Sequence, residues 1–221
     1  MKNIVFGLTL LLLFLTGCSQ KEVVVQPKSK SISNIQDEQE LSTRMAIIHS
    51  ALKHLNKSSS EDCSGFIALV NRETNETLYK SEELYKYFDN TSRAKAIFNM
   101  LKDENRLVTD TLPKIGDIVF FSDTLQKNKR VIGAFNITHI GIVTEVDDDG
   151  TVHFIHNIQG SPRIDQLNIE HSNHQILSGK NVNSFLKRCP KTKAKNECLS
   201  SFFFSAYGSP IPKEKTHISK N

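Results

Sequence analysis

Cys63 is the residue of this sequence best placed for nucleophilic chemistry. It lies between Asp62 and the small pair Ser64 and Gly65, at the predicted start of a helix over residues 63–71. A helix N-terminus offers free N–H groups and a partial positive charge, so we expect a lowered pKa for Cys63. Asp62 is the predicted helix cap, and the amides around Ser64 are predicted to stabilise an oxyanion. A cysteine without partners is more often a buried structural residue, so the hypothesis requires a base.

Two histidines on a predicted hairpin are the candidate partners. β-branched residues at 138–146, a turn of three aspartates and a glycine, and apolar residues at 151–157 predict two antiparallel strands. If Val146 pairs with Thr151, His139 and His156 become diagonal neighbours, close enough for their rings to hydrogen-bond. The same face is apolar, and we expect it to pack under the Cys63 helix.

Cys63, His139 and His156 then form a predicted nucleophile, base and base-orienting residue. A shift of the pairing by one residue would replace His156 with Asn157 on that face. Without the cysteine motif, the two histidines would be interpreted as ordinary core or surface residues.

The surrounding elements change from helices to strands along the chain. A helix is predicted from Asp37 to near Asn56, and its apolar residues recur every three or four positions as one inward face: Leu41, Met45, Ile48, Leu52 and Leu55. After the helix that begins at Cys63, a short helix capped by Ser81 is predicted to run through Phe88. A fourth helix is predicted to be capped by Asn90 or Thr91, with an inward face of Ala94, Ile97, Phe98 and Leu101. Strands are predicted at 118–121, in the hairpin and at 201–207. Helices followed by an antiparallel sheet indicate an α+β fold.

Four segments in order carry a resemblance to a known family. They are Asp62-Cys63-Ser64-Gly65-Phe66, Gly116-Asp117-Ile118-Val119-Phe120-Phe121, His139-Ile140-Gly141-Ile142-Val143 and Phe154-Ile155-His156. Over residues 41–166 the chain resembles the NlpC-type cell-wall cysteine peptidases; the related CHAP amidases share the first three motifs more loosely. The resemblance implies a papain-like α+β fold, the triad named above and peptidoglycan stem peptides as substrate, usually cut between D-Glu and a diamino acid.

One departure from that family keeps other functions open. Its members often carry a Tyr and a Trp-Gly-Gly stretch before the cysteine motif, where this chain has residues 56–61, Asn-Lys-Ser-Ser-Ser-Glu. The alternatives are a CHAP-like N-acetylmuramoyl-L-alanine amidase and a non-catalytic lipoprotein that binds the cell wall.

The N-terminus has the features of a targeting signal. A positive start and an apolar run over residues 4–15, too short to span a membrane, end in Leu15-Thr16-Gly17-Cys18, which resembles the bacterial lipobox. We predict a signal peptide at 1–17, a lipidated Cys18 with a flexible tether at 18–36, the peptidase domain at 37–208 and a flexible tail at 209–221. The implied location is the cell envelope, on the periplasmic face of the outer membrane. The alternative is an ordinary signal with a chance cysteine.

Other partners are predicted to be absent. The net charge of +4 is small and dispersed, which argues against a nucleic-acid binder. The remaining histidines do not give three or four converging ligands, so we predict neither a metal nor another cofactor. Cys189 and Cys198 lie close together in sequence, and a non-cytoplasmic location favours a disulfide between them.

Overall fold

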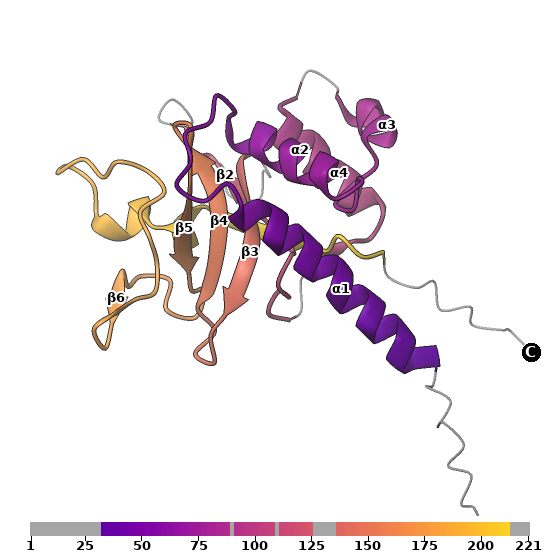
Figure 1. Ribbon diagram of the computed structural model, residues 1–221. Helices are drawn as coiled ribbons and strands as arrows, with labels where there is room; N and C mark the ends of the chain where they lie inside the picture. Colours follow the sequence, from indigo (N-terminus) through magenta and orange to yellow (C-terminus); the bar gives the residue numbers. More distant parts are fainter. Residues whose placement is uncertain (1–31, 89–90, 109–110, 126–135, 213–221) are drawn as a thin grey trace, which may run out of the picture.

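The predicted α+β architecture is confirmed. The structure is a computed structural model that describes residues 32–88, 91–108, 111–125 and 136–212 (Figure 1). N-terminal helices pack on an antiparallel sheet of six strands in the order β1-β8-β2-β3-β4-β5. The predicted signal peptide and Cys18 lie outside the described residues. Among the helices within those ranges, none is long and apolar enough to cross a membrane.

The elements follow one another in the order that the sequence predicts, with additions in the C-terminal half. The helices are α1 (Ile32–Leu52), α2 (Cys63–Glu73), α3 (Ser81–Leu84), η1 (Tyr85–Tyr87), α4 (Arg93–Asp103), η2 (Lys195–Cys198) and α5 (Ser200–Phe203). The strands are β1 (Leu107–Val108), β2 (Ile118–Ser122), β3 (Ile137–Val146), β4 (Val152–Ile158), β5 (Ser161–Leu167), β6 (Ile176–Leu177), β7 (Lys180–Asn181) and β8 (Phe204–Gly208).

Helix α1 differs from its prediction in its start and in its inward face. It begins at Ile32, so the last residues of the predicted tether are helical, and Figure 1 shows its first turns extending away from the sheet. Leu41 and Met45 are about half exposed and Leu52 is also exposed, whereas Ile48 is buried as predicted, together with Ile47 and Ala51. The helix is rotated because it directs the side chain of Arg44 into the protein, where it meets a buried carboxylate.

The sheet has an apolar core on each face. Ile140 and Ile155 point to the face covered by α2 and α4. Val143 and Phe154 point to the opposite core, with Phe203 of α5. The expectation that the face of Val143 and Phe154 packs under the Cys63 helix is therefore wrong. Both faces of these strands are apolar, so hydrophobicity could not identify the one that α2 covers.

The hairpin of β3 and β4 contains a bulge that the sequence did not indicate. Val143 pairs with Phe154 as predicted, but Val146 pairs with Val152 instead of Thr151. The two registers differ by one residue, and the shift occurs between Val143 and Glu145. An extra residue on one strand absorbs such a shift. The histidine end of the hairpin therefore keeps the predicted register although the turn end does not.

Several boundaries also differ from the predictions. The first part of the strand predicted at 201–207 is α5, and only β8 joins the sheet. The cap of α4 is Ser92, not Asn90 or Thr91. Ser209 and Pro210, predicted to belong to a flexible tail, accept hydrogen bonds from the side chain of Arg106 through their carbonyl oxygens. Residues 213–221 of that tail lie outside the described residues.

The loop before α5 is closed by a disulfide. Cys189 and Cys198 are joined with their Cα atoms 5.5 Å apart. Cys198 is buried, so the bond ties an exposed, lysine-rich loop to the core. Among the described cysteines only Cys63 is free.

Candidate active site

Helix α2 presents Cys63 at its first position. Asp62 Oδ1 accepts hydrogen bonds from the Gly65 amide at 2.7 Å and from the Ser64 hydroxyl at 2.9 Å, so Asp62 is the helix cap. The side chain of Glu61 lies against Gly65, where a Cβ atom would collide with its carboxylate. A larger residue at position 65 would require the Glu61 side chain to move.

The segment before Cys63 is fastened to the strands that carry the histidines. Three hydrogen bonds do this: Asn56 N–H to the Pro162 carbonyl at 2.8 Å, Ser59 N–H to the Gly160 carbonyl at 2.7 Å, and Asn157 Nδ2 to the Glu61 carbonyl at 2.8 Å. These bonds hold residues 56–61, the segment that precedes the cysteine motif. This segment holds the start of α2 against the hairpin of β4 and β5.

The sulfur of Cys63 lies beside β3, at the residue that follows the candidate base His139. The backbone amide of Ile140 hydrogen-bonds to this sulfur. The pairing of β3 with β4 begins only at Ile142, which leaves the stretch around His139 and Ile140 paired with β2 alone. No hydrogen bond of the described residues joins Cys63 to His139, a common state of catalytic pairs before substrate binds.

His139 and His156 are in direct contact. His139 Nε2 lies 2.6 Å from His156 Nδ1, and the His156 side chain is fully buried. Gly141 makes the contact possible, because a Cβ atom there would lie only 3.2 Å from the Cβ of His156 and 3.0 Å from the Ile155 carbonyl oxygen. Asn157 does not take the place of His156, since it binds the Glu61 carbonyl instead.

The electrostatics of the site differ from the prediction for the cysteine. Burial and the negative charge of Asp62 raise the pKa of Cys63 to about 11, although the amides of Ile140 and Ser64 oppose them. The expected lowering of this pKa is therefore wrong, because desolvation of a thiolate outweighs the helix N-terminus here. Burial also lowers the pKa of His139 well below its ordinary value, and the adjacent His156 adds to this effect.

At neutral pH the Cys63 thiol and the His139 imidazole are thus both neutral. Such a pair reacts by general-base catalysis, in which the imidazole takes the thiol proton as the sulfur attacks. The free amides at the start of α2 lie near the same sulfur and are suited to bind an oxyanion.

Two residues next to the histidines, Asp165 and Arg163, were not predicted from the sequence. Asp165 Oδ2 accepts from His156 Nε2 at 2.9 Å and from Arg163 Nη2 at 3.0 Å. Both lie on β5, which was not predicted. Gln159 and Gly160 have positive φ angles, as a tight hairpin turn requires, and an alternating strand follows. The Gln-Gly pair after an apolar strand was the available signal.

A cluster of possible metal ligands lies at the other end of the hairpin. Glu145, Asp147 and His153 bring one ligand atom each to within 4.8 Å of one another. His153 Nε2 already bonds to Asp147 Oδ2 at 3.2 Å. The cluster is exposed to partly exposed and lies at the turn end of strands whose opposite end carries the histidine pair, so no step of the chemistry at Cys63 involves it.

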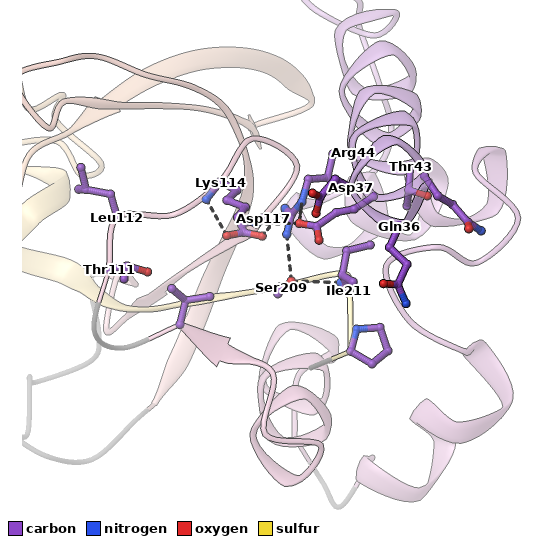
Figure 2. Close-up of a pocket in the computed structure, with 14 residues that line it drawn as sticks. Gln36, Asp37, Thr43, Arg44, Thr111, Leu112, Lys114, Asp117, Ser209 and Ile211 are labelled. Carbon is purple, nitrogen blue, oxygen red and sulfur yellow. Dashed lines mark hydrogen bonds and ion pairs between the residues drawn. The ribbon is translucent and has the colours of Figure 1, made fainter. Parts of the chain in front are cut away.

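A second polar cluster lies in a cleft of about 730 Å³ between α1, the segment before β2 and the chain after β8 (Figure 2). Arg44 Nη1 bonds to Asp117 Oδ1 at 2.6 Å and to the Ile115 carbonyl at 2.9 Å. The Gly116-Asp117 motif therefore anchors α1 to β2. It does not contribute to the cysteine site.

Comparison with known proteins agrees with this fold. The family model of the CHAP domain matches residues 55–157, just under half of the chain, and this range contains Cys63, His139 and His156. Residues 55–157 are thus similar to the CHAP domain, a papain-like cysteine peptidase or amidase domain found in cell-wall hydrolases. No curated protein and no solved structure matches the chain.

Proposed function

We propose that this protein is a peptidoglycan hydrolase that cleaves stem peptides with Cys63 as nucleophile, His139 as base and His156 as the residue that orients the base. One observation carries the proposal. A free cysteine at a capped helix start lies beside the Ile140 amide, and the preceding residue, His139, contacts His156 at 2.6 Å. The CHAP domain match supports the same substrate class.

The reaction follows from the protonation states of the site. The Cys63 thiol gives its proton to His139 while the sulfur bonds to the amide carbon, and the carbonyl electrons move to oxygen. When the tetrahedral intermediate collapses, the C–N bond breaks and protonated His139 gives its proton to the leaving amine. A water molecule then loses a proton to His139 as it attacks the thioester. The acid product leaves, and Cys63 regains its proton.

We propose two alternative activities, which differ in the bond that is cut. The first is NlpC-type endopeptidase activity between D-Glu and the diamino acid; the second is CHAP-type amidase activity between N-acetylmuramic acid and L-Ala. Purified cell wall treated with the protein should release fragments whose masses identify the bond, and Cys63→Ala should release none. If the folded wild type binds cell wall without releasing fragments, the non-catalytic wall-binding role replaces both.

The location of the protein is a separate proposal. The lipobox-like tetrad supports a lipid anchor at Cys18, and two or three acyl chains hold a protein stably at a membrane. The tether between the lipid and α1 would let the domain reach peptidoglycan from the outer membrane. Cells that express the protein should incorporate labelled fatty acid into it, and Cys18→Ala should abolish the label. An unlabelled wild type would refute the anchor.

A further inference from the structure

Both ring nitrogens of His156 are engaged in hydrogen bonds. Nδ1 lies 2.6 Å from His139 Nε2, and Nε2 lies 2.9 Å from Asp165 Oδ2. The His156 side chain is fully buried and Asp165 is largely buried, so water does not compete for these bonds. Asp165 lies outside residues 55–157, so the family match does not include it.

The chain of hydrogen bonds fixes where the protons lie. An ionised carboxylate only accepts hydrogen bonds, so the proton of neutral His156 lies on Nε2, next to Asp165. Nδ1 of His156 is then an acceptor, and His139 must donate to it from Nε2. The remaining nitrogen of neutral His139, Nδ1, is left without a proton and is the atom able to act as a base.

Asp165 itself is held in its ionised form. Burial raises its pKa, but the hydrogen bond from His156 and the charge of Arg163 more than offset this, and the pKa of Asp165 is lowered. Arg163 reaches the carboxylate with Nε at 3.2 Å and Nη2 at 3.0 Å. The charged or titratable groups that act on the two rings are thus Asp165 and Arg163 from β5, besides the effect of His156 on His139.

We propose that Asp165 is a positioning residue that acts through His156: its carboxylate selects the ring protonation that leaves His139 Nδ1 free to accept the proton of Cys63. Without it, His156 can place its proton on Nδ1 and donate to His139. His139 then carries its own proton on Nδ1, and the base is lost. The carboxylate also stabilises the positive charge that His139 gains during attack.

The first test is the position of the ring protons in the resting protein. Long-range ¹⁵N–¹H NMR spectra of the wild type should show both His139 and His156 protonated on Nε2. Asp165→Asn should give a mixture of the two tautomers, and Asp165→Glu should restore the wild-type pattern. A wild-type His156 that is protonated on Nδ1 overturns the proposal, even if every variant fails to fold.

The second test is kinetic and rests on the proposed function. Asp165→Asn should lower kcat by about 10- to 100-fold, the usual cost of losing a supporting contact behind a catalytic group. KM should stay within about twofold, because the contact acts on the base and not on substrate binding. The acid limb of the pH–kcat profile should move to lower pH, since Asp165 raises the pKa of His139.

The matched control is Asp147→Asn, which breaks another aspartate–histidine pair on the same hairpin. It should leave kcat within about twofold of the wild type. Wild-type kcat in Asp165→Asn overturns the catalytic part of the proposal. If the wild type itself shows no turnover, the proposed function fails, and the NMR spectra still decide whether Asp165 sets the ring protons.

Discussion

The end of the sheet that carries the proposed catalytic residues and the Arg44–Asp117 cleft both bury polar groups, but the hydrogen bonds of these groups differ. In the cleft, the guanidinium of Arg44 donates to Glu40, Ile115, Asp117 and Ser209, and so holds α1 against the rest of the protein. At the catalytic end, His156 is fully engaged, while no hydrogen bond links Cys63 to His139. Saturated buried groups stabilise a fold. Groups such as Cys63 and His139, which are not hydrogen-bonded to each other, remain able to react.

The largest expected effect is on the cysteine. Cys63→Ala should lower peptidoglycan hydrolysis by roughly 10⁴-fold or more, because the nucleophile acts as a unit with its base. Cys63→Ser should be nearly as inactive, since its hydroxyl is harder to deprotonate than the thiol. Fragment release from purified cell wall measures the loss. A thermal melt should show little change, and activity retained in Cys63→Ala would move the reactive group elsewhere.

In the cleft, we expect substitutions to lower stability without lowering activity. Asp117→Asn or Arg44→Met should lower the free energy of unfolding by about 3–5 kcal/mol, because each leaves a buried charge without its partner. Turnover per folded molecule should not change. Urea unfolding measures the stability, and the double variant should recover part of the loss. Lys53→Ala, which breaks the exposed ion pair with Glu73, is the control and should cost less than about 1 kcal/mol.

His156 and Asn157 are neighbours on β4, and their substitution should affect kcat to different degrees. His156→Ala should reduce kcat by about 10²-fold or more, because His139 loses its orienting partner. Asn157→Ala removes the contact with the Glu61 carbonyl and should cost about tenfold or less, by loosening the segment before Cys63. Steady-state kinetics on folded variants decide between them. A larger loss for Asn157→Ala would show that the position of α2 matters more than the ring contact.

The rate at which Cys63 is alkylated in the free protein should depend on pH. Since burial raises the pKa of Cys63 to about 11, its alkylation by iodoacetamide should accelerate with rising pH up to about that value. A pre-formed thiolate would instead react at a constant rate from neutral pH upward, and that result would reverse our description of the resting site.

The same burial predicts a loss of stability in acid. The folded-state pKa values of His139 and His156 are lowered, so the unfolded chain binds more protons below its ordinary histidine pKa of about 6.5. Unfolding free energy should therefore fall as pH drops through that value, and it should fall less in His139→Gln. Urea titrations at several pH values measure the slope.

Local signals in the sequence were sufficient for much of the site. Asp62 before Cys63 indicated a capped helix start, and β-branched strands around an acidic turn indicated the hairpin of His139 and His156. The inward face of α4 was also predicted correctly, because Ala94, Ile97, Phe98 and Leu101 are all buried. Each of these features depends on residues near one another in the chain, so propensity and spacing determine it.

Only the tertiary structure decided the features that join distant segments. Arg44 meets Asp117 across 73 positions, and this ion pair holds α1 against β2. The pKa of Cys63 depends on how deeply β3 and α2 bury its sulfur, which overrides the local effect of the helix start. Asp165 reaches His156 because β5 pairs beside β4. Desolvation and charge pairing depend on which groups surround an atom in space, and sequence spacing does not specify that environment.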